Sequence, residues 1–333
     1  MRRLPVACDS LYRFRVSDHT PERPMSMKRF RVAGHSMLPT LQPGQEVVAV
    51  NTRTPRPGNL VVFQHPNDTS LWLIKRLVDD EGTVLSDNRE DSAHDSHDFG
   101  PIHLSRLWNV VDRLDADTFV LACEMLISED PDLAELVDRW GIPEFWNRRP
   151  GFETLVLLIL EQQVSLASGA AMYGRVARLT GRVTPGNVLA AGEHRLRSIG
   201  LTRQKTGYLL DLARRLVDGE LDLAILEELS EDVARRELIS IRGIGPWTAD
   251  AYLLSASRRP DMWPVGDRAL QVGSAEVLGL DSVPDEAELE ILAESWRPVR
   301  AVAARLIWHS YLSERGRVEP PDATLVHAPE TRA

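Results

Sequence analysis

The chain contains only two cysteines, Cys8 and Cys123, among its 333 residues. Two cysteines argue against a disulfide framework and against an iron–sulfur cluster with four thiolate ligands. The sequence also has no apolar run near the roughly 18 residues that a membrane span requires, and its first residues form no sustained apolar stretch. These absences predict a cytoplasmic protein that does not enter a membrane.

Lysine is nearly as scarce as cysteine, and the overall charge is acidic. The three lysines are Lys28, Lys75 and Lys205, so arginine supplies almost every cation. A retained lysine is notable because lysine can lose its proton and arginine in practice cannot. The net charge is −10, which argues against a DNA-binding protein held by bulk electrostatics alone. After residue 113 the chain has 24 Lys+Arg against 35 Asp+Glu, so DNA binding there would require local phosphate contacts.

The hydrophobic pattern divides the chain into four parts. Residues 1–27 are polar and are expected to be a disordered or mis-started tail, with Met25 and Met27 as alternative initiators. Residues 28–113 hold short apolar runs separated by Pro, Gly and Asn, which predicts a small, mostly-β domain. Residues 114–316 repeat apolar positions at helical spacing, which predicts an all-α domain. Residues 317–333 read as a second disordered tail. The fold class is therefore multidomain, β then α.

Residues 238–250 predict two helices joined by a tight turn. Gly243 and Gly245 allow a close backbone turn, and Pro246 suits the first position of a new helix. The free N–H groups at such a helix start can bind a phosphate without net positive charge on the domain. The alternative from the residues alone is an ordinary corner between two helices.

Four segments together resemble a known family. They are GIGPWTADAYLL (243–254), PVGDRALQ (264–271), ILEQQVSLASGAA (159–171) and WRPVRAVAARLIW (296–308). In this order they resemble the helix-hairpin-helix-GPD superfamily of base-excision DNA glycosylases, within it the alkylpurine (3-methyladenine) group, over about residues 114–315. The resemblance implies a two-lobed helical fold and a monomer that acts on double-stranded DNA with alkylated bases. It requires no cofactor or metal and leaves room for a monovalent cation at the hairpin.

The resemblance also assigns residues. It makes Asp267 the catalytic carboxylate, although an aspartate there could also simply cap a helix. It places an aromatic base pocket at Trp247, Trp308 and, less directly, Tyr252, with core packing as the alternative for Trp308. The residues expected to contact DNA are Gly243, Ile244, Gly245, Arg242, Thr248, Gln162 and Gln163, with Arg203 and Lys205 as further phosphate contacts. Gln162 and Gln163 could instead make helix-end hydrogen bonds.

The position after the hairpin distinguishes two chemistries. Relatives with lyase activity have a lysine two residues after the last glycine of the turn, and that lysine forms a Schiff base. This chain has Trp247 there. Since an indole offers no amine nucleophile, the resemblance implies hydrolysis without β-elimination.

The N-terminal boxes resemble a second family. Ser36 lies in Gly34-His-Ser-Met-Leu-Pro-Thr, and Lys75 follows the apolar run 71–74. Burial can lower the pKa of a lysine enough for it to accept the proton of a serine. Residues 28–113 resemble the signal-peptidase/LexA-type Ser–Lys peptidases, in the form of the nickel superoxide dismutase maturation proteases, with Ser36 as nucleophile and Lys75 as base.

Several positions depart from the peptidase pattern. Gln45 and Asn59 stand where relatives usually have aspartate, Ser86 replaces a glycine, and His97 replaces an arginine. An inert folded remnant of a peptidase therefore stays open beside an active peptidase.

Three functional hypotheses follow. The first is a monofunctional alkylpurine DNA glycosylase fused to a peptidase-like domain. The second is a Ser–Lys peptidase that processes a propeptide or its own chain, with the helical domain serving only to bind damaged DNA. The third is a lesion-binding protein in which both sites are silent.

Overall fold

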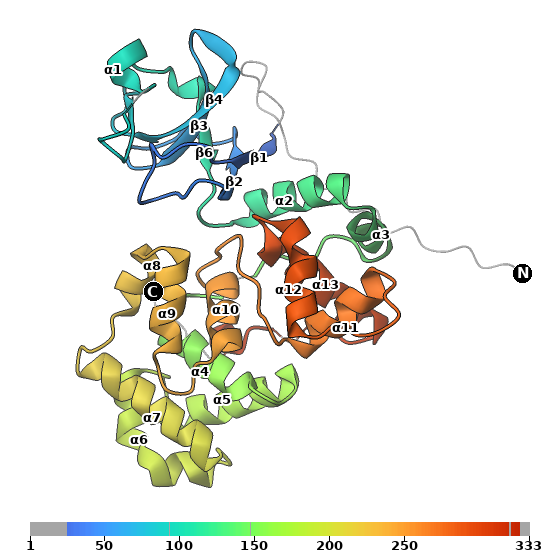
Figure 1. The fold of residues 1–333 in the computed structure, drawn as a ribbon. Coiled ribbons are helices and arrows are strands. Elements are labelled where there is room, and N and C mark those ends of the chain that lie inside the picture. Colours follow the sequence, from blue (N-terminus) through green and yellow to red (C-terminus); the bar gives the residue numbers. More distant parts are fainter. Residues whose placement is uncertain (1–24, 93, 147, 320, 327–333) are drawn as a thin grey trace, which may run out of the picture.

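The computed structural model describes residues 25–92, 94–146, 148–319 and 321–326, so the expected tail 1–24, with Cys8, lies outside the described residues. A β-sheet is followed by an all-helical part (Figure 1). The strands are β1 (Met27–Arg31), β2 (Glu46–Val50), β3 (Leu60–His65), β4 (Asp68–Leu77), β5 (Val84–Leu85) and β6 (Trp108–Val110). Between β5 and β6 lie the helix α1 (Ser96–Phe99) and the short 3-10 helix η1 (Leu104–Arg106). The first helices after β6 are α2 (Ala116–Glu129) and α3 (Pro131–Trp140).

The remaining helices form the body of the molecule. They are α4 (Phe152–Glu161), α5 (Leu166–Thr180), α6 (Pro185–Ser198), α7 (Arg203–Val217), α8 (Leu223–Glu228), α9 (Glu231–Ile239), α10 (Pro246–Ser255), α11 (Arg268–Val277), α12 (Glu286–Ala293), the 3-10 helix η2 (Glu294–Trp296), α13 (Arg300–Glu314) and α14 (Ala323–Val326). Within the described ranges every strand precedes α2, which confirms the predicted change from a β part to an α part.

The six strands form one antiparallel sheet with the order β1-β2-β6-β3-β4-β5. The valine-rich runs of β2 and β3 suit a pleated, buried surface, and most of β2 and half of β3 are buried. The long strands β3 and β4 pair directly, with Val62 opposite Ile74, so the two apolar runs seen in the sequence become neighbours. Lys75 thereby enters a buried row of the sheet.

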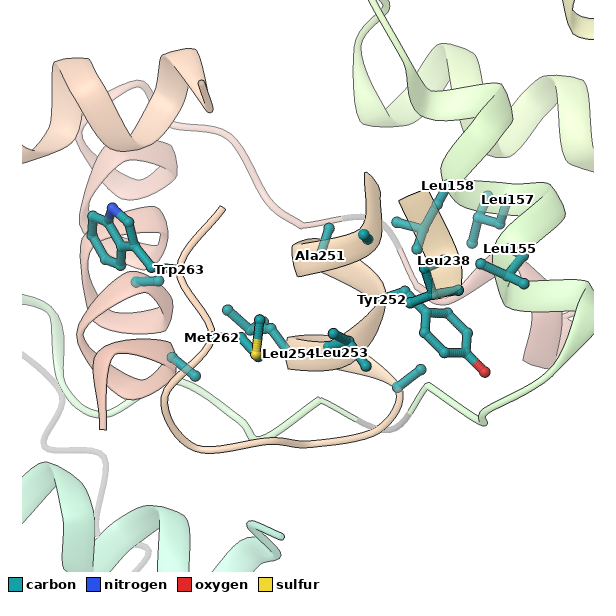
Figure 2. Packing of buried hydrophobic residues seen from close by; sticks show 14 of the residues in the cluster. Leu155, Leu157, Leu158, Leu238, Ala251, Tyr252, Leu253, Leu254, Met262 and Trp263 are labelled. Atoms are coloured by element: carbon teal, nitrogen blue, oxygen red, sulfur yellow. The ribbon is translucent and has the colours of Figure 1, made fainter. Parts of the chain in front are cut away.

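Two apolar helices, α4 and α10, lie at the centre of the helical part. Every residue of α4 except Glu153 is buried, and α10 is buried from Thr248 to Ser255. A helix that is apolar on all sides needs neighbours on all sides, so the other helices surround this pair. Figure 2 shows part of the core, where leucines of α4 approach Leu238 of α9 and the ring of Tyr252.

The sheet and the helices share one hydrophobic core. Val48 and Val50 of β2 belong to the same buried cluster as Phe119 of α2. The backbone N–H of Leu114 donates to the carbonyl of Arg258 at 2.8 Å, just before Asp115 caps α2. The β part is therefore packed directly on the helical part.

Two of the predicted boundaries change in the structure. β1 begins at Met27, one residue before the expected start of the β domain. The expected disordered tail 317–333 is wrong for its described part, because α14 forms there and Glu319 pairs with the Arg305 guanidinium at 2.5 Å. The pairing shows why: the cationic head of a buried arginine requires a carboxylate, and the segment supplies it. Residues 320 and 327–333 lie outside the described residues.

Among the described residues, no helix has both the length and the apolar character required to cross a membrane.

The thiol of Cys123 provides a test of this packing. It is fully buried on α2, and burial raises its pKa to about 12. In a Cys8→Ser variant, where Cys123 is the remaining thiol, on the order of one thiol in ten thousand would be ionised at pH 8. We expect its reaction with a disulfide reagent to be at least about 100-fold slower in buffer than in denaturant, measured by absorbance. Rapid reaction in buffer would contradict the packing of α2.

Candidate active site

A cavity of about 1390 Å³ opens beside the turn between α9 and α10. Its wall comes from the segment before α4, the end of α4, the start of α5, the α9–α10 turn, the start of α11 and one face of α13. Trp247, Asp267 and Trp308, which are far apart in the sequence, all line it. The charged side chains of its lining are four arginines and three carboxylates, namely Arg148, Arg268, Arg305, Arg317, Glu161, Asp267 and Glu319. The lining is thus not acidic, although the helical part as a whole is.

Asp267 lies at the N-cap of α11 and accepts three hydrogen bonds. Its Oδ1 accepts from the backbone N–H of Leu270 at 2.9 Å and from the Trp308 indole at 3.0 Å. Its Oδ2 accepts from the Trp247 indole at 2.7 Å. The side chain is half-buried at the wall of the cavity. The cap that the sequence offered as an alternative is therefore present, and the same carboxylate also faces the cavity.

Three tryptophans from three segments line the cavity. Trp247 comes from the start of α10, Trp308 from α13 and Trp146 from the segment before α4. The Trp146 and Trp308 rings meet edge to face, with 5.7 Å between their centroids. An aromatic wall beside a carboxylate is suited to a flat ring with positive charge.

The expectation that Tyr252 belongs to this aromatic wall is wrong. Its side chain is fully buried in the core between the helices, and its hydroxyl accepts from the backbone N–H of Gly151 at 2.8 Å. Residue 251, one position earlier, lines the cavity instead, and it is an alanine. Successive side chains on a helix are rotated by about 100°, so residue 251 faces the cavity while residue 252 faces the core.

The turn between α9 and α10 is fixed by close packing. Gly243 has φ +88°, and a Cβ at this position would lie 2.2 Å from the Tyr208 ring. Ile244 is buried and anchors the turn in the core. Gly245 and Pro246 are exposed, and Pro246 begins α10. The predicted geometry, a helix start exposed directly after a glycine turn, is confirmed, while the binding of DNA there remains a prediction.

The two glutamines at the end of α4 have different positions. The Gln162 amide donates to the carbonyl of Gly243 and to the Thr248 hydroxyl, both at 2.9 Å. Thr248 is itself buried, so this pair of side chains fixes α4 to the turn. Gln163 has φ +59° and is exposed at the cavity. Gln163 is therefore exposed at the cavity, while Gln162 supports the turn.

The three side chains expected to contact phosphate also differ in their surroundings. Arg242 and Arg203 are exposed near the turn and at the start of α7. The Lys205 amine donates to the carbonyls of Leu160 and Gln162 at 2.7 and 2.9 Å, so it caps the end of α4. Burial lowers the pKa of Lys205. Its role in the structure is thus to hold α4, and a phosphate contact for it remains untested.

Sequence reasoning missed several polar or aromatic residues of the lining, among them Trp146, Arg148, Glu161 and Arg305. Arg305 donates to the carbonyl of Glu144 at 2.9 and 3.0 Å, and its guanidinium lies 4.9 Å from the Trp146 ring centre. The Glu161 carboxylate lies 3.4 Å from Arg148, and burial raises the pKa of Glu161 while Arg148 opposes that shift. The segment 141–150 has no helical pattern, so no periodic signal pointed to Trp146 or Arg148.

In the β part, Lys75 is 2% exposed, and its amine donates to the Ser86 hydroxyl at 2.8 Å. Burial lowers the pKa of Lys75, and the nearby carboxylates Asp95, Asp91 and Asp98 oppose that shift. Ser36 is half-buried, and its carbonyl accepts from the backbone N–H of Asn88 at 2.9 Å. Ser86 was noted in the sequence only as a departure from the peptidase pattern, and it is a hydrogen-bond partner of the lysine.

Two family models match parts of this chain. Residues 156–298 match the HhH-GPD superfamily base excision DNA repair protein. Residues 23–83 match signal peptidase, peptidase S26. The first match contains the glycine turn and Asp267, and the second contains Ser36 and Lys75 but ends before Ser86. The helical part thus contains a segment that is similar to the HhH-GPD superfamily.

Individual proteins resemble the helical part. A DNA-3-methyladenine glycosylase of Bacillus subtilis is 28% identical over 193 residues, which are 50% of this chain and 57% of that protein. DNA-3-methyladenine glycosylase 2 of Escherichia coli is 29% identical over 178 residues, 49% of this chain and 60% of that protein. The chain thus spans less than two thirds of the length of these curated relatives.

Solved structures show the same helical fold. A DNA-3-methyladenine glycosidase of Bacillus halodurans is similar with a TM-score of 0.51 and 27% identity over 62% of this chain and 96% of that one. A 3-methyladenine DNA glycosylase of Schizosaccharomyces pombe, in complex with abasic DNA, has a TM-score of 0.53 at 23% identity, with coverage of 56% and 94%. Each match covers nearly all of the solved structure and more than half of this chain.

The packing of Gly243 against Tyr208 gives a prediction for stability. In Gly243→Ala the methyl group would overlap the ring, and alanine disfavours the positive φ. We expect the free energy of unfolding to fall by about 2–4 kcal/mol, measured by chemical denaturation with circular dichroism. Gly245→Ala is the matched control, because its φ is −90° and its Cβ would meet nothing within 4 Å. Equal effects of the two changes would argue against the contact.

Proposed function

We propose that this protein is a DNA glycosylase of base-excision repair that hydrolyses the N-glycosidic bond of alkylated purines. The single observation that supports this most is the Asp267 carboxylate, held by two indoles at the wall of the cavity beside the glycine turn. The similarity to DNA-3-methyladenine glycosylases supports the substrate class. The partner is double-stranded DNA with an alkylated base, bound by a monomer.

The reaction follows from the charges of its components. An alkylated purine is cationic, so its bond to the sugar is already weakened, and the base departs with the bonding electron pair. Positive charge then develops on the sugar, and the Asp267 carboxylate stabilises it. A water molecule adds to the sugar carbon and loses its proton to the carboxylate. The products are the free base and an abasic site. The three hydrogen bonds to Asp267 keep its carboxylate oriented without neutralising its charge.

The base must leave the helix stack to reach this carboxylate. The tryptophan wall would hold a cationic base by cation–π attraction, worth roughly 0.5–2 kcal/mol for each ring. Gln163, exposed at the end of α4, would fill the gap in the duplex, and the start of α10 would bind the phosphate backbone. The proposal also takes the helices as two lobes, with α4 to α10 on one side of the cavity and α2, α3 and α11 to α13 on the other.

The proposal includes hydrolysis only. The residue that would be a Schiff-base lysine in lyases is Trp247, whose indole donates to Asp267. Lysine is also absent from the cavity lining formed by the described residues. No side chain there offers an amine to the sugar, so β-elimination lacks its nucleophile.

The charge of Asp267 is the first quantity to test. In Asp267→Asn the side chain can still cap α11, but the negative charge is lost. We expect release of 3-methyladenine from methylated duplex DNA to fall at least about 100-fold, measured by chromatography of the free base. Binding to DNA that carries an abasic site should change little. In the wild type, borohydride should trap no covalent complex with DNA.

The control for this variant is Asp285→Asn. Asp285 caps α12 through the same kind of bond, to the backbone N–H of Glu288 at 2.9 Å, and does not line the cavity. Unchanged base release in this control would separate the loss of charge from the loss of a helix cap. Wild-type activity in Asp267→Asn, or a trapped covalent complex, would reject the proposed chemistry.

We propose a second function for the β part, that of a Ser–Lys peptidase acting on a propeptide or on this chain. The specific observation in its favour concerns Lys75, which is buried, has a lowered pKa and donates to the Ser86 hydroxyl. In this proposal Ser36 is the nucleophile, Lys75 the base, and Ser86 a side chain that orients the amine. The alternatives are a folded remnant without activity and a protein that binds lesions with both sites silent.

A fluorophosphonate probe separates these possibilities. We expect one adduct per chain on Ser36, located by peptide mass spectrometry, and its loss in Ser36→Ala and Lys75→Met. Because the pKa of Lys75 is lowered, labelling should increase with pH below the range in which an ordinary lysine loses its proton. Ser70→Ala, a change at an exposed serine of β4, should label normally. An adduct on another serine, or none, would leave the β part without the proposed dyad.

A further inference from the structure

Glu161 is a buried carboxylate of the cavity that the proposed hydrolysis does not use. It ends α4, is 7% exposed and lines the same cavity as Asp267. Its neighbour Arg148 also lines the cavity, with side-chain nitrogens 3.4 and 3.5 Å from the two carboxylate oxygens. Hydrogen bonds between ions usually measure about 2.7–2.9 Å. The pair is therefore open enough for both groups to bind a third partner.

The packing of α5 on α4 fixes the position of this carboxylate. Gly169 of α5 lies against it, and a Cβ at that glycine would be 2.5 Å from the Glu161 Cγ. The glycine thus leaves the space through which the Glu161 side chain passes. A buried ion pair is costly to desolvate, and an apolar pair of similar volume would often stabilise a fold as well. The cost is explained if the carboxylate has a ligand in the cavity.

The chemistry of the pair selects a particular base edge. Arg148 offers donors, and the Glu161 carboxylate offers two adjacent acceptor oxygens. The Watson–Crick edge of guanine presents an acceptor, O6, and two adjacent donors, N1–H and N2–H₂. These three groups match the pair. The same edge of adenine presents one donor group and one acceptor, so one carboxylate oxygen would lose its water without a new partner, which disfavours binding.

We propose that Glu161, with Arg148 beside it, is the specificity-determining residue that reads the base in this cavity, and that it favours guanine-type lesions with free N1–H and N2–H₂ groups. This inference rests on the proposed function, because it assumes that a flipped purine enters the cavity. It adds to that function a preference within the alkylated purines and a residue that sets it.

Free bases test the inference without requiring catalysis. The full chain is titrated with 7-methylguanine and with 7-methylhypoxanthine, which lacks only the N2 amino group, and tryptophan emission is followed because three tryptophans line the cavity. We expect 7-methylguanine to bind about tenfold more tightly to the wild type, since one hydrogen bond to a charged group distinguishes the two. In Glu161→Gln the ratio should fall to within about threefold, because the amide offers one acceptor in place of two.

The matched control is Glu153→Gln on the same helix, which lies outside the cavity lining and should keep the tenfold ratio. If Glu161→Gln does not fold, the relative affinity of the wild type for the two bases still tests whether the cavity prefers the guanine-type base. Equal binding of both bases, no binding of either, or an unchanged ratio in a folded Glu161→Gln variant would overturn the inference.

A third measurement separates this inference from the proposed function. Asp267→Asn should keep the preference for 7-methylguanine while base release from DNA is lost. Selective binding of free bases without any base release by the wild type would reject the hydrolase and retain the base-reading site. Base release by the wild type with equal binding of the two free bases would reject the base-reading site and retain the hydrolase.

Discussion

The Asp267 carboxylate is the contact on which the geometry of the cavity depends. It accepts hydrogen bonds from the start of α10, from the start of α11 and from α13, so three helices must be in place before its position is defined. Each donor is a neutral N–H group, and together they offset part of the cost of removing a charge from water. The cavity therefore has this carboxylate at a fixed point of its wall, beside the indole rings of Trp247 and Trp308.

This arrangement is possible because α4 and α10 are apolar on nearly every side and form a rigid centre. Two of the residues that face the cavity lie at the ends of these helices: Gln163 follows α4, and Trp247 belongs to the first turn of α10. Gln162 joins the two ends through the carbonyl of Gly243. Placement at helix ends combines a fixed backbone with free N–H groups, which in the proposed function would bind phosphate without net positive charge on the domain.

The sheet is part of the same folded body. Val48 and Val50 share the core of α2, and Arg29 of β1 pairs with Glu129 of α2 at 2.8 Å. A module on a flexible tether would leave such apolar positions exposed to water. The shared core instead makes the stability of each part depend on the other, and it fixes the Ser36 and Lys75 segment relative to the helical cavity.

The β-then-α order and the glycine turn before a new helix could be predicted from the sequence alone, because periodicity and turn residues act over short stretches of chain. The set of side chains that line the cavity could not be predicted in this way. The tertiary structure moved Tyr252 into the core, assigned different roles to Gln162 and Gln163, added Trp146, Arg148 and Glu161, and drew Glu319 from the expected tail onto Arg305. The physical reason is that burial depends on contacts between segments distant in sequence, and a rotation of one helical position changes which partner a side chain meets.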